Sequence, residues 1–229
     1  MLQNKINKIK QLIDIKNLIE LNPKPSLNNI TDKLDKYLNF ENGFFVELGA
    51  NNGYNQSNTF HLEYLKKWTG ILIEGIPELY HTCKYLRINS VVENYACVSN
   101  NLIQNEIEMR YAGLMSIVTG ALKSKKNDNE HVNNGLKCQK IDKEYTVKVK
   151  TNTLTNILTK HKISKIDFLS LDVEGYELEV LKGLNLNKFK PTYICVEARF
   201  YEEINNHLKS KYKMIEQLSH HDYLYKVKH

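Results

Sequence analysis

Acidic residues follow two apolar segments that have the composition of buried strands. Asp172 ends the run 166–171 and is followed by Glu174, and Glu197 ends the run 191–196. In an open α/β sheet, ligands bind outside the carboxyl ends of the parallel strands. Carboxylates that meet there could act as a general base or hold a divalent cation of the Mg²⁺ type through oxygen ligands. We therefore predict catalytic roles for Asp172 and Glu174, and we name Asp172 and Glu197 as the ligands of any metal.

A glycine-containing turn, residues 47–53, follows the apolar run 44–48. Gly49 would let the chain turn sharply, and Gly53 would let the backbone approach a ligand closely. Glu47, the acid that closes the strand, could hold the charged amino group of a methionine-like ligand. The spacing G-x-x-x-G differs from the G-x-G-x-x-G of dinucleotide sites. A ligand-binding turn and an ordinary tight turn are both open at this point.

A further acid, Glu74, ends the next apolar run, about 25 residues after Gly49. An acid at that position accepts hydrogen bonds from both hydroxyls of an adenosine ribose. The glycine turn and the acid on consecutive strands together predict a cofactor that carries adenosine. Ala96 and Cys97 end the third predicted strand, where the edge of the adenine would lie. For these two positions, a small buried residue with no ligand is the alternative.

Two adjacent histidines, His220 and His221, occupy the turn of a predicted C-terminal hairpin. If that turn lies at the cofactor edge of the sheet, a histidine there would titrate near neutral pH, as a general base should. An exposed turn without a catalytic role is the alternative. We expect the other histidines on helix surfaces or in loops; they are His61, His81, His131, His161 and His207.

Strand-like and helix-like segments alternate from residue 43 onward, which predicts a mostly parallel sheet with helices on both faces. The expected strands are 44–48, 70–74, 91–97, 145–150, 166–171 and 191–196, with an extended piece at 106–111. The expected helices are 57–67, 77–87, 153–162, 176–182 and 201–209. A short link joins the final strands, 212–217 and 223–227, so this pair is antiparallel. A parallel sheet with such a hairpin is typical of the Rossmann-like class I methyltransferase fold.

The chain divides into a helical N-terminal extension, residues 1–40, and one α/β domain, residues 41–229. The spacing of Leu2, Ile6, Ile9 and Ile13 predicts an amphipathic helix over 2–19. A second helix is expected from Thr31, which could cap it, to about residue 39. The extension could pack on the domain, mediate a homo-oligomer or cover a substrate. Residues 113–144 are polar and poorly patterned, so we expect a variable loop or lid there.

Composition limits the class of protein. The 229 residues are 41% hydrophobic, which is enough for a core. The sequence has no apolar run long enough to span a bilayer and no apolar centre of a signal peptide. Four scattered cysteines without a C-x-x-C pair are typical of reduced thiols. These features predict a cytoplasmic protein.

The formal net charge is +6. Residues 120–150 hold eight lysines and four acidic residues. This segment could attract an anionic substrate, such as a nucleotide-sugar or a nucleic acid, but a solvated lysine-rich surface is the favoured interpretation of the lysines. The sequence lacks a basic strip interleaved with aromatic residues, so a nucleic-acid partner is not favoured.

With these residues in view, the chain resembles the FkbM family of methyltransferases between about residues 44 and 197. The segments that carry the resemblance are 45–50, Ser57-Asn58-Thr59, 68–74 and, above all, 167–183 with Asp172-Val173-Glu174-Gly175-Tyr176-Glu177. Two departures stand out: Glu47 replaces the aspartate of many members, and Gly75 replaces a proline.

The resemblance implies S-adenosylmethionine as cofactor and a small-molecule acceptor, usually a hydroxyl oxygen on a sugar, glycan or other metabolite. The protein would align the reactants and handle the proton, and the sulfonium would supply the reactivity. The residues expected around the cofactor are Glu47, Gly49, Ala50, Asn51, Gly53, Asn58, Glu74, Ala96, Cys97 and Asp172.

Three other functions stay open from the sequence. A nicotinamide-dependent oxidoreductase would also need a glycine turn and an acid, but the G-x-G-x-x-G spacing is missing and the terminal hairpin disfavours it. A nucleic-acid methyltransferase would show binding that weakens steeply with salt. A non-catalytic cofactor-binding module would bind the ligand without methylating any acceptor.

Overall fold

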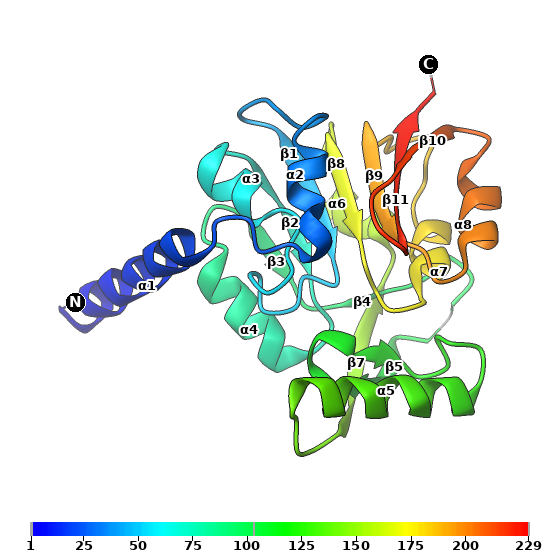
Figure 1. Ribbon diagram of the computed structural model, residues 1–229, viewed down its shortest axis with the longest axis horizontal. Coiled ribbons are helices and arrows are strands. Elements are labelled where there is room, and N and C mark those ends of the chain that lie inside the picture. Colours follow the sequence, from blue (N-terminus) through cyan, green and yellow to red (C-terminus); the bar gives the residue numbers. More distant parts are fainter. Residues whose placement is uncertain (1, 103, 229) are drawn as a thin grey trace.

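The computed structural model describes residues 2–102 and 104–228. Within these residues the main sheet has seven strands in the order β10-β11-β9-β8-β1-β2-β3 (Figure 1). The bounds of these strands are β1 Phe44–Leu48, β2 Thr69–Ile73, β3 Val91–Glu93, β8 Phe168–Leu171, β9 Tyr193–Glu197, β10 Tyr212–Gln217 and β11 Asp222–Val227.

Strand direction confirms the predicted fold. The pairs β1–β2, β1–β8, β2–β3 and β8–β9 are all parallel. Strand β11 is antiparallel to both β9 and β10, so β10 runs with the parallel strands. The turn between β10 and β11 therefore lies at the carboxyl edge of the sheet, and the hairpin closes the sheet on one side.

Apolar side chains of the strands alternate between two faces, and each face packs against helices. Val46, Leu48 and Ile71 share one buried cluster with α6 (Leu154–Lys160), α7 (Glu177–Lys182) and α8 (Tyr201–Leu208). Phe45 and Leu72 share another cluster with α2 (Ile30–Leu34), α3 (Phe60–Leu65) and α4 (Pro77–Leu86). This layering leaves the carboxyl edge of the strands open for a site.

A second, four-stranded sheet, in the order β4-β7-β5-β6, lies beside the carboxyl edge of the main sheet (Figure 1). Its strands are β4 Ala96–Cys97, β5 Glu106–Tyr111, β6 Ile117–Val118 and β7 Tyr145–Asn152. The prediction of a single strand over 91–97 is wrong, because β3 joins the main sheet and β4 joins the small one. Between them, Asn94 Nδ2 donates hydrogen bonds of 2.8 Å to the carbonyls of Glu74 and Gly75, which redirects the chain.

The prediction of a loop over 113–144 is also wrong for much of that segment. The segment contains η2 (Gly113–Met115), β6 and the fifteen-residue helix α5 (Lys125–Gln139). Ser124 caps α5 by accepting a hydrogen bond from the backbone amide of Asn127. The helix buries only a narrow stripe, including Val132, against the small sheet. That stripe holds too few apolar residues to produce a helical pattern in the sequence.

The N-terminal extension contains α1 (Leu2–Leu21), η1 (Leu27–Asn29) and α2. Helix α2 begins at Ile30, and Thr31 lies inside it, where its hydroxyl bonds to Ser26 Oγ rather than capping the helix. The buried side chain of Leu34 joins the core under the main sheet. Among the described residues, no helix combines the length and the apolar character that a bilayer crossing requires.

Candidate functional site

The turn after β1 packs tightly against the end of β8. Gly49 has a φ of +75°, and a Cβ atom there would lie 1.7 Å from the carbonyl oxygen of Asp172. The amides of Gly49 and Ala50 donate to the carbonyl of Ile73 at 3.1 and 3.2 Å, which ties the turn to β2. Glycine is required here because only its backbone tolerates both the positive φ and the close approach.

Glu74 lies directly beside this turn. Its Oε2 accepts a 2.8 Å hydrogen bond from the amide of Asn51, and its Oε1 accepts one of 2.8 Å from the amide of Ile76. Burial raises the pKa of Glu74 to about 7, although these amide donors partly oppose that rise. The glycine turn and the acid thus meet at one edge of the sheet, as an adenosine site needs.

The carboxylate of Glu47 is buried and already bonded inside the protein. It accepts hydrogen bonds from the hydroxyls of Ser57 and Thr59 and from the amide of Asn58. Arg87 also donates to it, at 3.3 Å. Glu47 therefore holds the segment 57–59 against β1. That it also binds the amino group of a methionine-like ligand stays a prediction.

Gly53 has a packing role in the structure. Its φ is +83°, and a Cβ atom there would meet the side chains of Arg87 and Cys83, at 2.9 and 3.0 Å. Gly53 is also not among the residues that line the cavity described next. Its small size serves the packing of α4 against the turn, and its role beside a cofactor stays a prediction.

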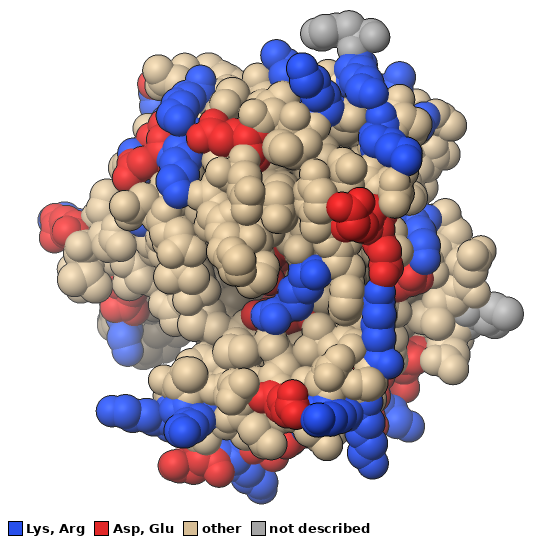
Figure 2. All heavy atoms as spheres, turned by 45° about the vertical axis from the view of Figure 1, so that its right-hand side comes forward, with Lys and Arg blue, Asp and Glu red and all other residues tan. Residues whose placement is uncertain are grey.

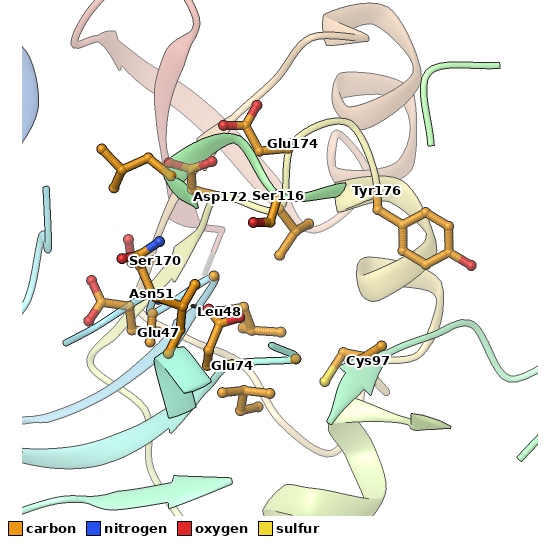
Figure 3. Close-up of a pocket in the computed structure, with 18 of the residues that line it drawn as sticks. Glu47, Leu48, Asn51, Glu74, Cys97, Ser116, Ser170, Asp172, Glu174 and Tyr176 are labelled. Carbon is orange, nitrogen blue, oxygen red and sulfur yellow. Dashed lines mark hydrogen bonds between the residues drawn. The ribbon is translucent and has the colours of Figure 1, made fainter. Parts of the chain in front are cut away.

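One cavity is enclosed by the turn, by Glu74 and by the end of β8. Figure 3 shows Glu47, Asn51, Glu74 and Asp172 around this space, with Cys97 and Tyr176 on its other side. Every predicted cofactor residue except Gly53 lines it: Glu47, Gly49, Ala50, Asn51, Asn58, Glu74, Ala96, Cys97 and Asp172. The cavity volume is about 90 Å³, below the roughly 300–1,000 Å³ typical of ligand pockets.

A second cavity, of about 300 Å³, adjoins the first. Five residues line both: Gln56, Asn58, Leu114, Asp172 and Glu174. The rest of its wall comes from segments far apart in the sequence: Leu27, Ile30, Met115, Cys138, Gln139, Glu197, Arg199 and Asp222. On one face of the molecule, acidic and basic side chains meet in a central hollow (Figure 2). The two cavities could hold a cofactor and an acceptor side by side.

Three carboxylates converge where the cavities meet. Asp172, Glu174 and Glu197 each offer an oxygen within 4.8 Å of the others. Desolvation, together with the negative charges of Glu197 and Glu174, raises the pKa of Asp172 well above its usual value. Burial also raises the pKa of Glu174, to about 7, against the opposing effect of Arg199. Such a cluster favours a proton or a cation between its oxygens.

A strained turn aims Glu174 into this cluster. Glu174 and Gly175 have φ values of +56° and +101°. The buried Glu177 braces the turn, because its Oε1 accepts hydrogen bonds from the amides of Val173 and Gly175 at 3.2 and 2.8 Å. Arg199 also donates to Oε2 of Glu174. Glu177 thus supports the turn that carries Glu174, three positions earlier in the chain.

One protein family matches most of the chain. Residues 47–225 match the Methyltransferase FkbM domain family. The chain belongs to the FkbM methyltransferase family. The predicted resemblance is confirmed, and with it the assignment to S-adenosylmethionine-dependent methyltransferases.

Solved structures similar to this FkbM-family chain were also found. Fibrillarin from Aeropyrum pernix, in complex with natively bound S-adenosyl-L-methionine, has a TM-score of 0.47 and 13% identity over 87% of this chain and 76% of that one. A TehB-like S-adenosylmethionine-dependent methyltransferase from Corynebacterium glutamicum has a TM-score of 0.44 and 7% identity over the full length of both chains. An S-adenosylmethionine-dependent methyltransferase from Aquifex aeolicus has a TM-score of 0.40 and 13% identity over 93% of this chain and 96% of that one. No curated protein matches the chain.

In this FkbM-family chain, His220 and His221 lie at the predicted edge of the sheet, but both are exposed. Neither lines the two cavities, whereas the following Asp222 does. Their catalytic role stays a prediction.

The sequence did not lead us to predict that Arg199 and His131 belong to the site. His131 was expected on a surface, but it is buried on α5, with Nε2 at 3.4 Å from Oε2 of Glu174. Arg199 lies two residues after Glu197, in the turn between β9 and α8, and this closeness in the sequence was the signal that could have identified it. Nothing in the sequence near His131 indicates its neighbours.

Proposed function

We propose that this chain transfers the methyl group of S-adenosylmethionine to a hydroxyl oxygen of a sugar or another small metabolite. The observation that carries the proposal is the position of Asp172, which lines both cavities and meets two further carboxylates at their junction. A base at that junction would stand between the methyl donor and the hydroxyl.

The first cavity would hold the cofactor. Glu74 would accept hydrogen bonds from the ribose hydroxyls, and Ala96 and Cys97 would lie along the adenine. The backbone of the turn at Gly49 and Asn51, with the side chain of Asn58, would line the methionine end. This arrangement directs the sulfonium toward Asp172 and the second cavity.

Methyl transfer to a hydroxyl is an in-line displacement. A lone pair of the hydroxyl oxygen attacks the methyl carbon, the carbon–sulfur bond breaks, and its electrons return to sulfur as S-adenosylhomocysteine forms. The hydroxyl proton must leave, and a carboxylate of Asp172 or Glu174 would accept it. Because burial and like charges raise the pKa of both side chains, each is a stronger base than an exposed carboxylate.

A divalent cation also fits the donor set. Carboxylate oxygens are the ligands that Mg²⁺ prefers, and Asp172 and Glu197 would hold the ion, while Glu174 is already bonded to Arg199. A cation bound there would make the acceptor hydroxyl more acidic. In that case the two residues would also fix the orientation of the hydroxyl.

The wall of the second cavity disfavours a nucleic-acid acceptor. Asp172, Glu174, Glu197 and Asp222 contribute four carboxyl groups, and Arg199 contributes the single basic side chain among its lining residues. A phosphate-rich backbone would be repelled by this wall, whereas a neutral sugar hydroxyl would not. For a nucleotide-sugar, the diphosphate would have to lie outside the cavity.

The decisive experiment compares Asp172→Asn with Glu130→Gln, a substitution of an exposed acid on α5. S-adenosylhomocysteine binding is measured by calorimetry, and methyl transfer to a panel of sugars and nucleotide-sugars is measured by mass spectrometry. We expect Asp172→Asn to reduce turnover by at least ~10²-fold, the scale of general base catalysis, with binding within a few-fold of wild type. Unchanged turnover would refute the site.

A chelator separates the two chemical options. If turnover stops in the presence of a strong chelator and returns with Mg²⁺, the Asp172–Glu197 pair acts through a cation. If turnover persists, the carboxylates act as the base alone. Binding of NAD in place of S-adenosylhomocysteine, detected by thermal shift, would overturn the cofactor assignment.

A further inference from the structure

The first half of α1 extends away from the protein body (Figure 1). All residues from Gln3 to Lys10 are exposed. The second half is anchored, because Ile15 is buried in a cluster with Tyr54, Phe60 and Leu86. A helical segment with so little packing gains no tertiary stabilisation, and short helices are marginal in water. The exposed half therefore calls for an external partner.

An apolar stripe runs along the outer side of α1, from its exposed first half into its second half. Ile6, Ile9 and Ile13 are 49%, 58% and 51% exposed. At 3.6 residues per turn the three side chains fall within roughly 60° of one another, on the side of the helix opposite Ile15. Helix α1 thus has two apolar faces: the inner one packs on the body, and the outer one meets solvent in the described structure.

Positive charge borders this outer stripe. Lys5 and Lys10 lie beside the stripe, whereas Lys8 lies toward the side of Ile15, and the first acid of the chain is Asp14. Helical spacing places Lys5 and Lys10 on the two sides of the stripe. An apolar stripe flanked by lysines is the pattern of helices that lie in the plane of a membrane interface.

The same lysines disfavour a second copy of the chain as the partner. If two stripes packed in parallel, Lys5 of one copy would lie beside Lys10 of the other. If they packed antiparallel about Ile9, the two Lys10 side chains would approach each other. Like charges at such positions destabilise helix pairs, whereas an anionic surface complements them.

We propose that the outer face of α1, formed by Ile6, Ile9 and Ile13 with Lys5 and Lys10, binds the surface of a membrane that contains anionic lipids. The isoleucines insert at the level of the headgroups, and the lysines attract the acidic lipids. Three half-exposed isoleucines bind weakly by themselves, so the interaction is reversible and depends on lipid charge and salt. The proposal is independent of the acceptor of methyl transfer.

The test uses the full chain with vesicles in a sedimentation assay. We expect binding to vesicles of phosphatidylcholine mixed with phosphatidylglycerol, little binding to phosphatidylcholine alone, and loss of binding as salt increases. The double variant Lys5→Gln/Lys10→Gln should bind on the order of 30-fold more weakly, at about 1 kcal/mol for each lysine near the surface. The variant Ile6→Gln/Ile9→Gln/Ile13→Gln should also lose binding.

A matched control tests whether any two lysines would serve. Lys209 and Lys213 lie on either side of the start of β10, and both are exposed. The variant Lys209→Gln/Lys213→Gln has the same net charge as the α1 lysine variant and should bind vesicles like wild type. Melting temperatures of all variants within a few degrees of wild type show that folding is preserved, as expected for substitutions of exposed side chains.

Three results would overturn the proposal. One is equal loss of binding in the control variant, which would indicate unspecific charge attraction. Another is a concentration-dependent dimer, seen by sedimentation equilibrium and abolished by the isoleucine variant, which would identify a second copy as the partner. The third is the absence of binding to anionic vesicles at low salt.

Discussion

The backbone amide of Asn51 donates a 2.8 Å hydrogen bond to Oε2 of Glu74, which joins the turn after β1 to the end of β2. These two segments approach each other although 23 residues separate them along the chain. The bond matters for binding, because it fixes the carboxylate beside the turn in the cavity assigned to the cofactor. The bond also stabilises the ionised form of Glu74, whereas burial of this side chain favours the protonated form.

Cofactor affinity should increase with pH because of Glu74. Its pKa is about 7, so its ionised fraction rises from roughly a tenth at about pH 6 to nine tenths at about pH 8. The ionised carboxylate is the better acceptor for two ribose hydroxyls, so S-adenosylhomocysteine should bind up to ~10-fold more tightly at the higher pH. Calorimetry at both pH values measures this. Glu74→Gln should bind more weakly and lose the pH dependence, and an equal dependence in that variant would contradict the assignment.

Gly49→Ala should destabilise the protein strongly. The new methyl group would meet the carbonyl oxygen of Asp172 at 1.7 Å, so the ends of β1 and β8 must separate. Gly120→Ala is a matched control, because Gly120 also has a positive φ, of +90°, but no atom within 4 Å of the new Cβ. We expect a loss of ~3–5 kcal/mol for Gly49→Ala and ~1 kcal/mol for the control in urea unfolding. Similar losses in both variants would mean that backbone strain alone matters at Gly49.

Arg87→Met should reveal a buried ionic network. Arg87 bonds to Glu63 at 2.8 Å and to Glu47 at 3.3 Å, and all three side chains are almost completely buried. Removing the arginine leaves two buried carboxylates without their cation, which should cost ~3–5 kcal/mol. The partly exposed pair of Arg110 and Glu144 provides the control, and Arg110→Met should cost ~1 kcal/mol or less. Denaturant unfolding measures the loss of stability in both variants. Equal losses would show that the buried network contributes no more stability than the partly exposed pair.

His61 should make the fold sensitive to acid. Burial lowers the pKa of this histidine from 6.5 to about 4, against the effect of nearby Asp35. Because the unfolded chain binds this proton more readily, the stability associated with neutral His61 is complete above pH 6.5 and is lost as pH falls toward 4.

The variant His61→Met should flatten the fall in unfolding free energy over that pH range by about 2–3 kcal/mol. His81→Met, at an exposed position on α4, should leave the pH profile unchanged. Thermal or denaturant unfolding at several pH values gives the comparison, and parallel profiles for wild type and His61→Met would disprove the role of His61.

Local sequence was sufficient to predict the main sheet and the position of its glycine turn. A buried parallel strand needs a short run of apolar residues, and a tight turn at its end needs glycine, so both leave marks that residues alone reveal. The same holds for Glu74, Asp172 and Glu197, because an acid directly after such a strand must lie at its carboxyl end. The residues of the segments 45–50, 57–59, 68–74 and 167–183 carried the resemblance to the FkbM family.

Only the tertiary structure decided how each of these side chains is used. It shows that Arg87 bonds to Glu47, that Gly53 makes room for a helix, and that His131 and Arg199 contact Glu174. It also shows α5 where the sequence indicated a loop, because that helix depends on a narrow contact with the small sheet. All of these features share one physical reason, because each depends on a residue that is distant in the sequence. Such a residue neutralises a buried carboxylate, occupies the space beside a glycine or covers the apolar face of a helix.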